Sequence, residues 1–234
     1  MTILQCILID ATAGEIKLTG NDMELGIETV IKGEIEHRGI IAIDAKIFSD
    51  IIRKLPDNEV VIETDSSFKT TITCEKAKFD IIGKSGEDFS YIPYIERNEE
   101  ITISQFTLKE VIRQTIFSIA DNDNNKLMTG ELFEINENSL KVVSLDGHRI
   151  SIRNIELKNN YEHKKVVVPG KTLQEISKIL PGNADEDVSM YLSDNHIVFE
   201  FGNTTVVSRL IEGEYFKIEQ MLSSDYETKV KINK

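Results

Sequence analysis

An internal duplication restricts the folds open to this chain more than any other feature of its 234 residues. Residues 3–22 align with residues 127–146 without a gap, and apolar positions match along both segments. After one inserted residue the match continues, so that Leu55-Pro56 falls on Leu180-Pro181. We therefore expect two copies of one folding unit, with the boundary in the polar segment 96–100.

Each copy is predicted to combine antiparallel strands with an amphipathic helix, which is an α+β unit. The shared helix is expected over Ala45–Leu55 and again over residues 171–180, where apolar residues recur with helical spacing and Leu-Pro ends the pattern. The second copy opens with an additional helix, predicted from about Ser104 to Ala120. Thr107 and Glu110 are candidates for its capping box.

The pattern predicts three segments of unequal size. A first domain over residues 1–99 lacks a counterpart of the additional helix, and a second, central domain covers residues 100–226. Residues 227–234 resemble the strand that leads into the additional helix, so we expect them to begin a third copy. The first domain should then expose an apolar face and be the less stable of the two.

Composition excludes several classes of function. The formal net charge of −13 argues against general affinity for nucleic acid, so any DNA contact must come from locally clustered Lys and Arg. Cys6 and Cys74 lie in strand-like runs and indicate buried thiols in a reducing compartment. The sequence contains no pattern typical of a signal peptide or a membrane span, so we expect a cytoplasmic protein.

Three sites imitate catalytic or ligand-binding chemistry. Residues 166–172 run from strand to helix like a phosphate-binding loop, but Lys165 stands where its first glycine is needed. Residues 121–125 alternate oxygen-bearing side chains like a calcium loop, yet the later glycine and glutamate are missing. Asp146 and His148 could form an acid–base pair, although a turn or a binding surface is favoured. We therefore predict no metal, no cofactor and no catalytic residue.

Basic residues recur on the predicted helices in a way that the net charge does not suggest. Lys46 and Arg53 are seven residues apart on the first helix, and Lys171 and Lys178 repeat this spacing on its duplicate. Seven residues make two turns, so each pair lies on one helix face. The additional helix carries a similar stripe, formed by Gln105, Lys109 and Arg113. Solvated surface explains a single stripe, whereas recurrence in both copies favours a binding face.

Several runs, in order along nearly the whole chain, resemble the bacterial DNA sliding clamp family, the beta subunit of DNA polymerase III. The runs are Ile3–Ile9, Leu18–Ile27, Phe48–Pro56, Gly86–Phe89, Leu108–Ile112, Thr129–Phe133, Asp146–Arg149 and Ser208–Gly213. The resemblance implies three tandem domains per subunit, with antiparallel sheets outside and two helices per domain lining a ring. Two subunits close head to tail around duplex DNA, as a homodimer, and contact phosphate without reading sequence.

The resemblance also assigns residues by position. Those implied to face DNA are Lys46, Arg53, Lys109, Arg113, Lys126, Lys171 and Lys178. Those implied to bind linear peptide motifs of the polymerase, the clamp loader, and repair and translesion polymerases are Leu145, Gly147, His148, Arg149, Ile150, Phe216 and Met221. Phe216 stands where the family pattern has proline, which changes the expected shape of the pocket.

The sequence thus predicts a non-catalytic processivity factor that tethers a polymerase to DNA. Because most of a third domain is not part of this sequence, we expect this chain by itself to be a monomer or an irregular associate. A peptide-docking adaptor that no longer encircles DNA is the alternative. An enzyme that uses Asp146 and His148 is a third possibility, for which the sequence offers no supporting residues.

Overall fold

The computed structural model describes residues 2–121, 125–222 and 227–233. It has the α+β class expected from the sequence. The first copy contains β1 (Cys6–Asp10), β2 (Ile16–Asn21), β3 (Leu25–Ile31), β4 (Ile40–Asp44), α1 (Ala45–Ile52), β5 (Val61–Thr64), β6 (Lys69–Cys74), β7 (Ala77–Ile82) and β8 (Lys84–Ser85). The second contains β9 (Ile101–Ser104), α2 (Gln105–Thr115), β10 (Gly130–Leu145), β11 (Ile150–Pro169), α3 (Gly170–Ile179), β12 (Asp187–Leu192), β13 (His196–Phe201), β14 (Thr204–Arg209) and α4 (Ile218–Met221). Short 3-10 helices cover Ile3–Gln5, Gly86–Asp88, Ile116–Ser118 and Lys126–Thr129.

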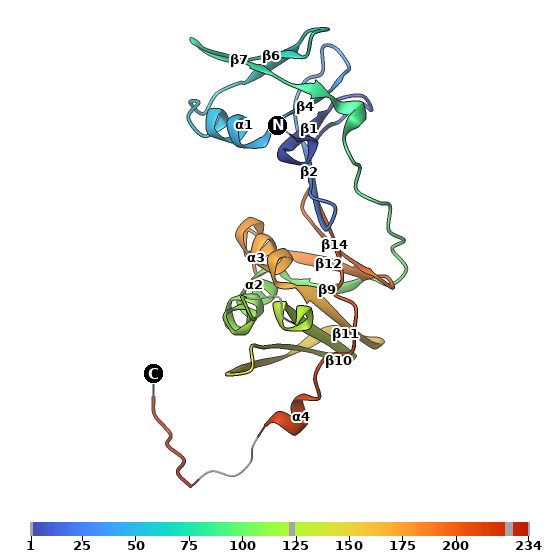
Figure 1. The fold of residues 1–234 in the computed structure, drawn as a ribbon, viewed down its shortest axis with the longest axis vertical. Helices are drawn as coiled ribbons and strands as arrows, with labels where there is room; N and C mark the ends of the chain where they lie inside the picture. Colours follow the sequence, from blue (N-terminus) through green and yellow to red (C-terminus); the bar gives the residue numbers. More distant parts are fainter. Residues whose placement is uncertain (1, 122–124, 223–226, 234) are drawn as a thin grey trace.

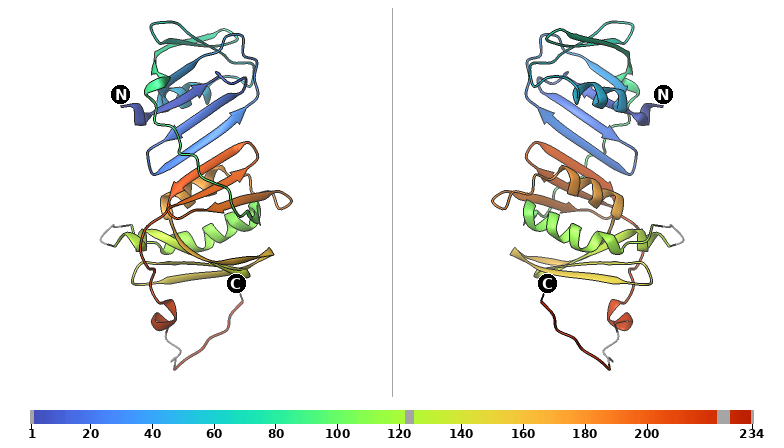
Figure 2. Two further views of the ribbon diagram at one scale, coloured as in Figure 1. Left: turned by 90° about the vertical axis from the view of Figure 1, so that its right-hand side faces the viewer. Right: turned by 90° about the vertical axis from the view of Figure 1, so that its left-hand side faces the viewer.

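One nine-stranded sheet passes through both copies, in the order β8-β4-β1-β2-β3-β14-β13-β12-β9. The two copies join where β3 pairs antiparallel with β14, from Thr29 opposite Thr204 to Leu25 opposite Ser208. Figure 2 shows the blue strands of the first copy continuing into the orange strands of the second. We call this β3–β14 pairing the domain joint; its backbone hydrogen bonds hold the copies in one sheet.

The first copy packs α1 on the sheet through Phe48 and Ile51. Asp44 caps the helix, because its carboxylate accepts the backbone N–H of Ile47 at 2.8 Å. The helix ends at Ile52, earlier than the predicted Leu55, and the chain leaves it in a tight turn in which Leu55 N–H still reaches the carbonyl of Ile51.

Apolar side chains remain exposed in this copy. The exposed apolar residues include Ile47, Ile52, Val61, Ile62, Phe79 and Ile82, and 68% of the surface of Ile82 is accessible. In the second copy α2 packs beside α3 and β9, and the part of the first copy that the structure describes has no corresponding helix. The exposure of Ile47 and Ile52 on α1, and of Ile62 and Phe79 on the sheet face of the buried Ile72, is consistent with a unit that is covered in one copy and uncovered in the other, whereas Val61 and Ile82 lie on the opposite sheet face.

The second copy holds the larger core, formed between α2, α3 and the strands. Ser104 caps α2 by accepting the N–H of Thr107 at 3.2 Å, so the capping box predicted at Thr107 and Glu110 is wrong. The α-helix ends at Thr115, short of the predicted Ala120, and continues as a 3-10 turn. Ser144 donates to the carbonyl of Thr115 at 2.6 Å and so satisfies an acceptor at the helix end.

The segment between the two copies runs across the face of the sheet that is opposite the helices (Figure 1). Asn21 donates to the carbonyl of Ser90 at 2.8 Å where this linker leaves the first copy. Ile92 then packs directly on Gly26, where an added Cβ would lie 2.6 Å from its Cγ1. Further along, Arg97 pairs with Glu200 at 2.6 Å. Because Gly26 belongs to β3 and Glu200 to β13, the linker contacts both sides of the domain joint.

The duplication is visible in the turns as well as in the helices. Asp22 accepts the N–H groups of Glu24 and Leu25 at 3.0 and 2.8 Å. Its counterpart Asp146 accepts those of residues 148 and 149 at 3.0 and 3.2 Å. The residue after each aspartate has positive φ, 77° at position 23 and 85° at position 147. Only the second of these is glycine, which adopts such a conformation without strain.

After β14 the chain forms α4 and then leaves the sheet (Figure 1). Residues 227–233, where a strand of a third copy was predicted, are exposed and are not in a strand. Within the described residues, no helix is long and apolar enough to span a membrane. Cys6 and Cys74 are both buried and free.

Candidate functional site

Three helices from the two copies lie on one side of the continuous sheet. Figure 1 shows α1, α2 and α3 on the same side, with the linker on the other. The arrangement follows from the duplication, because the domain joint repeats the orientation of one unit in the next. The cations predicted on these helices can therefore face one common surface, which we call the helix face.

The two cations of α1 are exposed at the helix face. Lys46 follows the first residue of the helix, and Arg53 caps its C-terminus. Neither is part of an ion pair within 4.0 Å among the described residues. A Lys or Arg without a protein partner is available to an external anion.

The cations of α2 are engaged by the protein itself. Lys109 is only partly exposed, and its ammonium donates to the carbonyl of Leu180 at the end of α3 at 2.7 Å. Arg113 forms two bonds with Glu110 on its own helix, 2.8 and 2.7 Å long. The hydrogen bond and the charge of Arg113 lower the pKa of Glu110.

The cations of α3 also have acidic partners. Lys178 pairs with Glu175 at 2.8 Å, one turn earlier on the helix. Lys171 pairs with Asp22, which lies in the first copy. Burial opposes ionisation of Asp22, but the hydrogen bond from Lys171 and those from two backbone N–H groups bring its pKa below the usual value. Lys126 is exposed in the 3-10 turn before β10.

The predicted peptide-binding residues divide between a cluster and a turn. Leu145 is fully buried and, together with the partly buried Ile150 and Phe216, belongs to one apolar cluster. Met221 lies at the end of α4 with 45% of its surface exposed. The structure therefore brings three of the four apolar residues together, and Met221 adds an exposed edge near the same short helix.

The polar residues of the predicted pocket lie in the turn between β10 and β11. Gly147, His148 and Arg149 are exposed. Arg149 pairs with Asp146 at 2.9 Å, and its guanidinium lies 5.7 Å from the ring centre of Phe117. Asp146 thus orients a turn and an arginine, and its contact with His148 is to the backbone. This geometry is that of a surface turn rather than an acid–base pair.

The residues that support this cluster were not predicted from the sequence. Tyr215 and Ile218 are buried beside Phe216, and Leu132, Val143 and Val167 complete the cluster from the strands. The hydroxyl of Tyr215 donates to the carbonyl of Val143 at 3.3 Å, and burial together with the nearby Glu131 raises its pKa. The alternation of apolar residues along β10 was a signal for Leu132 and Val143.

The sites that imitate other chemistry have structural explanations. Gly170 begins α3, where an added Cβ would lie 2.8 Å from the carbonyl of Thr129, so this glycine allows close packing rather than phosphate binding. Residues 122–124 of the calcium-like segment lie outside the described residues. In the remainder of the chain, no group of three His, Cys, Asp or Glu side chains is placed to hold a metal.

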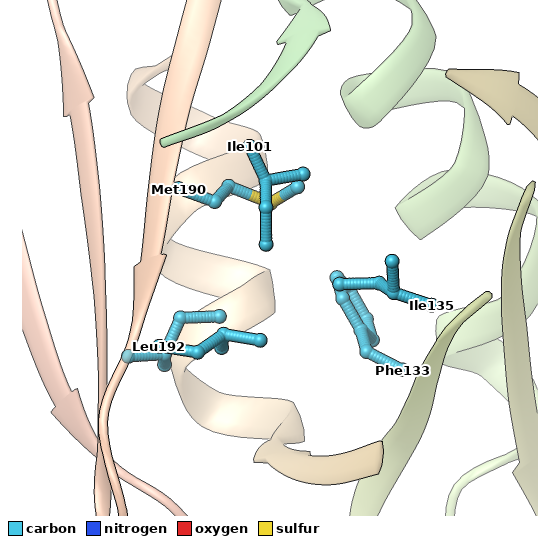
Figure 3. Close-up of a pocket in the computed structure, with 6 residues that line it drawn as sticks. Ile101, Phe133, Ile135, Met190 and Leu192 are labelled. Carbon is cyan, nitrogen blue, oxygen red and sulfur yellow. The ribbon is translucent and has the colours of Figure 1, made fainter. Parts of the chain in front are cut away.

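Two of the hollows formed by the described residues lie away from these sites. One is an apolar gap in the core of the second copy, lined by Ile101, Phe133, Ile135, Met190, Leu192 and Ile197 (Figure 3). The other is a shallow polar depression beside the strands β10 and β11, where Asn138 donates to Glu156 at 3.1 Å. The first lacks polar groups and the second is open, so neither is a small-molecule site.

Comparison with known proteins gives one family. Residues 1–93 match the model of the DNA polymerase III beta subunit N-terminal domain, and residues 102–217 match that of its central domain. A beta sliding clamp from Staphylococcus epidermidis is 34% identical over the whole chain, which spans 64% of that relative's length. A Staphylococcus aureus beta sliding clamp gives the same identity and coverage.

Solved structures agree with this result. A putative DNA polymerase III beta subunit from Eubacterium rectale is 81% identical, with a TM-score of 0.93 over 97% of this chain and 62% of that one. The sliding clamp of Bacillus subtilis is 32% identical, with a TM-score of 0.89 over 95% of this chain and 61% of its own. A Pseudomonas aeruginosa clamp bound to griselimycin is 25% identical, with a TM-score of 0.87 over 97% and 62% of the two chains.

Proposed function

The chain belongs to the DNA polymerase III beta subunit family of bacterial sliding clamps, and from this membership we propose that it supplies two domains of a ring around duplex DNA. The observation that supports this proposal is the domain joint, which continues one sheet from copy to copy while placing α1, α2 and α3 on one side. In such a ring the protein tethers a polymerase and catalyses nothing itself. We propose a cytoplasmic location for this role.

An acidic protein can contact DNA in this way if its cations are concentrated on the helix face. The net charge of −13 keeps the remaining surface from binding DNA, and phosphate contact by a few Lys and Arg is independent of sequence. Lys46 and Arg53 are the residues best placed for first contact, because they are exposed and have no acidic partner among the described residues. Contact of this kind holds DNA loosely enough for sliding.

Replacing both residues tests the DNA-facing surface. The double variant Lys46→Gln and Arg53→Gln should bind a short duplex more weakly and lose about 0.9 from the salt slope of log affinity for each phosphate contact removed. Fluorescence anisotropy across a range of salt concentrations measures both quantities. Lys17→Gln is the matched control. The side chain of Leu18 packs against the core under α1, and successive side chains of a strand point to opposite sheet faces, so Lys17 lies on the face away from the helices.

The results of these binding measurements distinguish the clamp from the adaptor. Equal salt slopes for the double variant and the wild type would contradict a role of α1 in DNA contact. If neither protein binds DNA while both bind a polymerase peptide, the peptide-docking adaptor is the better description.

The apolar cluster around Leu145 is proposed to dock linear motifs of the polymerase, the clamp loader and repair polymerases. Phe216 stacks edge-on against Tyr215, with ring centres 5.5 Å apart, and remains partly exposed. An aromatic side chain held in this manner can anchor an apolar peptide residue, while Arg149 and His148 provide a polar rim. The ring of Phe216 replaces the narrower proline of the family pattern, so the anchor pocket should be shallower.

Griselimycin is a suitable probe, since a relative from P. aeruginosa has been solved with it bound. We expect the wild-type chain to bind it, and Phe216→Ala to weaken binding by about tenfold, as for loss of an interface anchor. Isothermal titration calorimetry measures the difference. Tyr94→Ala is the control, because Tyr94 is exposed on the linker. Equal affinities for wild type and Phe216→Ala would place the ligand elsewhere.

A further inference from the structure

Lys171 lies on the helix face and is paired with an acidic residue of the other domain. It is the second residue of α3, on the helix face, and 61% of its side chain is exposed. Its ammonium bonds Oδ2 of Asp22, which lies in the turn between β2 and β3 of the other domain. A cation in this place that already has an acidic partner cannot bind phosphate with its full charge.

The turn holds Asp22 in place for this contact. Oδ1 accepts the backbone N–H groups of Glu24 and Leu25, at 3.0 and 2.8 Å, which leaves Oδ2 directed at Lys171. Lys171 is held from the other side as well, since the next residue, Thr172, shares a buried hydrogen bond with Ser208 at 2.6 Å. Ser208 lies opposite Leu25 in the domain joint. The joint therefore fixes both ends of the Lys171–Asp22 pair.

The duplicated positions show that the pair is specific to this location. Lys46 corresponds to Lys171, and among the described residues it has no ion-pair partner. Asp146 corresponds to Asp22, and it holds Arg149 of its own turn instead of a lysine on a helix. One lysine of the repeated pair is thus available and the other is engaged, although both occupy the same place in the unit.

We propose that Asp22 is a positioning residue that withholds Lys171 from DNA phosphate until duplex enters the helix face, when phosphate takes its place. The inference rests on the proposed function. It adds an order of DNA contact, in which the cations of α1 meet phosphate before Lys171 of α3 does. An exposed ion pair contributes little to stability, so its exchange for a phosphate contact has a small cost. The phosphate gains a cation whose position is already set by α3.

Asp22→Asn is the decisive variant, because an asparagine oxygen accepts the same two N–H groups while the charge is removed. It should bind a short linear duplex about threefold more tightly at low salt, with a salt slope close to that of the wild type, because Lys171 contacts phosphate in both complexes and only the wild type must first give up Asp22. Asp65→Asn is the matched control: it removes one negative charge from a similar turn, at the β5–β6 hairpin, where Asp65 accepts the N–H of Ser67 at 2.8 Å.

Lys171→Gln completes the cycle. It should weaken binding and abolish the effect of Asp22→Asn, so that the double variant binds like Lys171→Gln alone. A purely structural role of Asp22 would change thermal unfolding without changing the affinity for duplex.

The outcomes distinguish this inference from the proposed function. If the wild type binds duplex and Asp22→Asn binds with the same affinity, or with the gain also seen for Asp65→Asn, the inference is overturned and the clamp proposal stands. If neither wild type nor Asp22→Asn binds duplex at low salt, both are overturned. If Asp22→Asn alone binds, or binds more tightly than both the wild type and Asp65→Asn, Asp22 withholds Lys171 as proposed.

Discussion

At the scale of single residues, Glu131 is unusual, because a glutamate is rarely fully buried unless it is paired. It is fully buried at the start of β10, and no cation lies within ion-pair distance in the described chain. One oxygen has no partner, and the other lies 3.0 Å from the hydroxyl of Thr115. That hydroxyl already has an acceptor at 2.8 Å, the carbonyl of Val111. Since Thr115 has one hydrogen to donate, the pair is satisfied when Glu131 is protonated and donates to Thr115.

Burial accordingly raises the pKa of Glu131 to about 8. In the unfolded chain the carboxyl loses its proton near pH 4.5. Between these values the folded state binds more protons than the unfolded state, so stability falls as pH rises. The contribution is complete below pH 4.5 and is lost by about pH 8.

Glu131→Gln should remove this dependence, since an amide can donate to Thr115 at every pH. Relative to the variant, the free energy of unfolding of the wild type should fall by about 1.4 kcal/mol per pH unit across that window. Urea unfolding at several pH values measures the difference, and other titrating groups cancel. The exposed Glu36→Gln is the control. Parallel curves for wild type and Glu131→Gln would mean that the carboxyl is ionised in the fold.

At the scale of elements, the sequence predicted what is local and missed what connects distant segments. The helices α1, α2 and α3 were predictable because apolar periodicity is a short-range property, and the duplication supported two of them. The ends of the helices were less predictable. At the end of α2, the carbonyl of Thr115 accepts a hydrogen bond from Ser144, which lies on a strand 29 residues later. The domain joint has no local signature, because β3 and β14 are each ordinary strands until they pair.

The candidate sites show the same division. The positions of Lys171 and Lys178 on one helix face follow from their spacing, but their partners do not. Asp22 lies 149 residues from Lys171, and only the joined sheet brings them together. Tyr215 and Ile218 were missed because one lies just before α4 and the other begins it, and the four residues of α4 are too few for a periodic pattern. The linker's contact with the joint was missed as well, since nothing local relates Ile92 to Gly26.

At the scale of the whole molecule, the domain joint suggests how separate chains associate. In the second copy β12, β13 and β14 form a meander whose last strand joins the neighbouring domain. The first copy repeats this meander as β5, β6 and β7, and the hairpin turns match, with φ of 50° at Glu75 and 52° at Gly202. β7 therefore has the place of β14, but within the described chain its outer edge pairs with no strand.

The counterpart of β3 is the first part of β11, residues 150–156, which pairs with β10 alone. Among the described strands, one edge of each kind is thus unpaired, and the two edges lie at opposite ends of the molecule. Pairing of β7 with β11 of a second copy would repeat the domain joint head to tail, which is a heterologous contact.

A lysine on β7 should prevent this association. Ile82→Lys places a charge at the end of the β7 edge, where 68% of the isoleucine is exposed, and charged edge strands resist pairing with another chain. Light scattering over increasing concentration should show larger species for the wild type and a monomer for Ile82→Lys. Val61→Lys, on the opposite edge of the same three-stranded sheet, should associate like the wild type. If association survives Ile82→Lys but is lost with Val61→Lys, the contact belongs to β5. If the wild type stays monomeric at every concentration, the β7 edge does not pair.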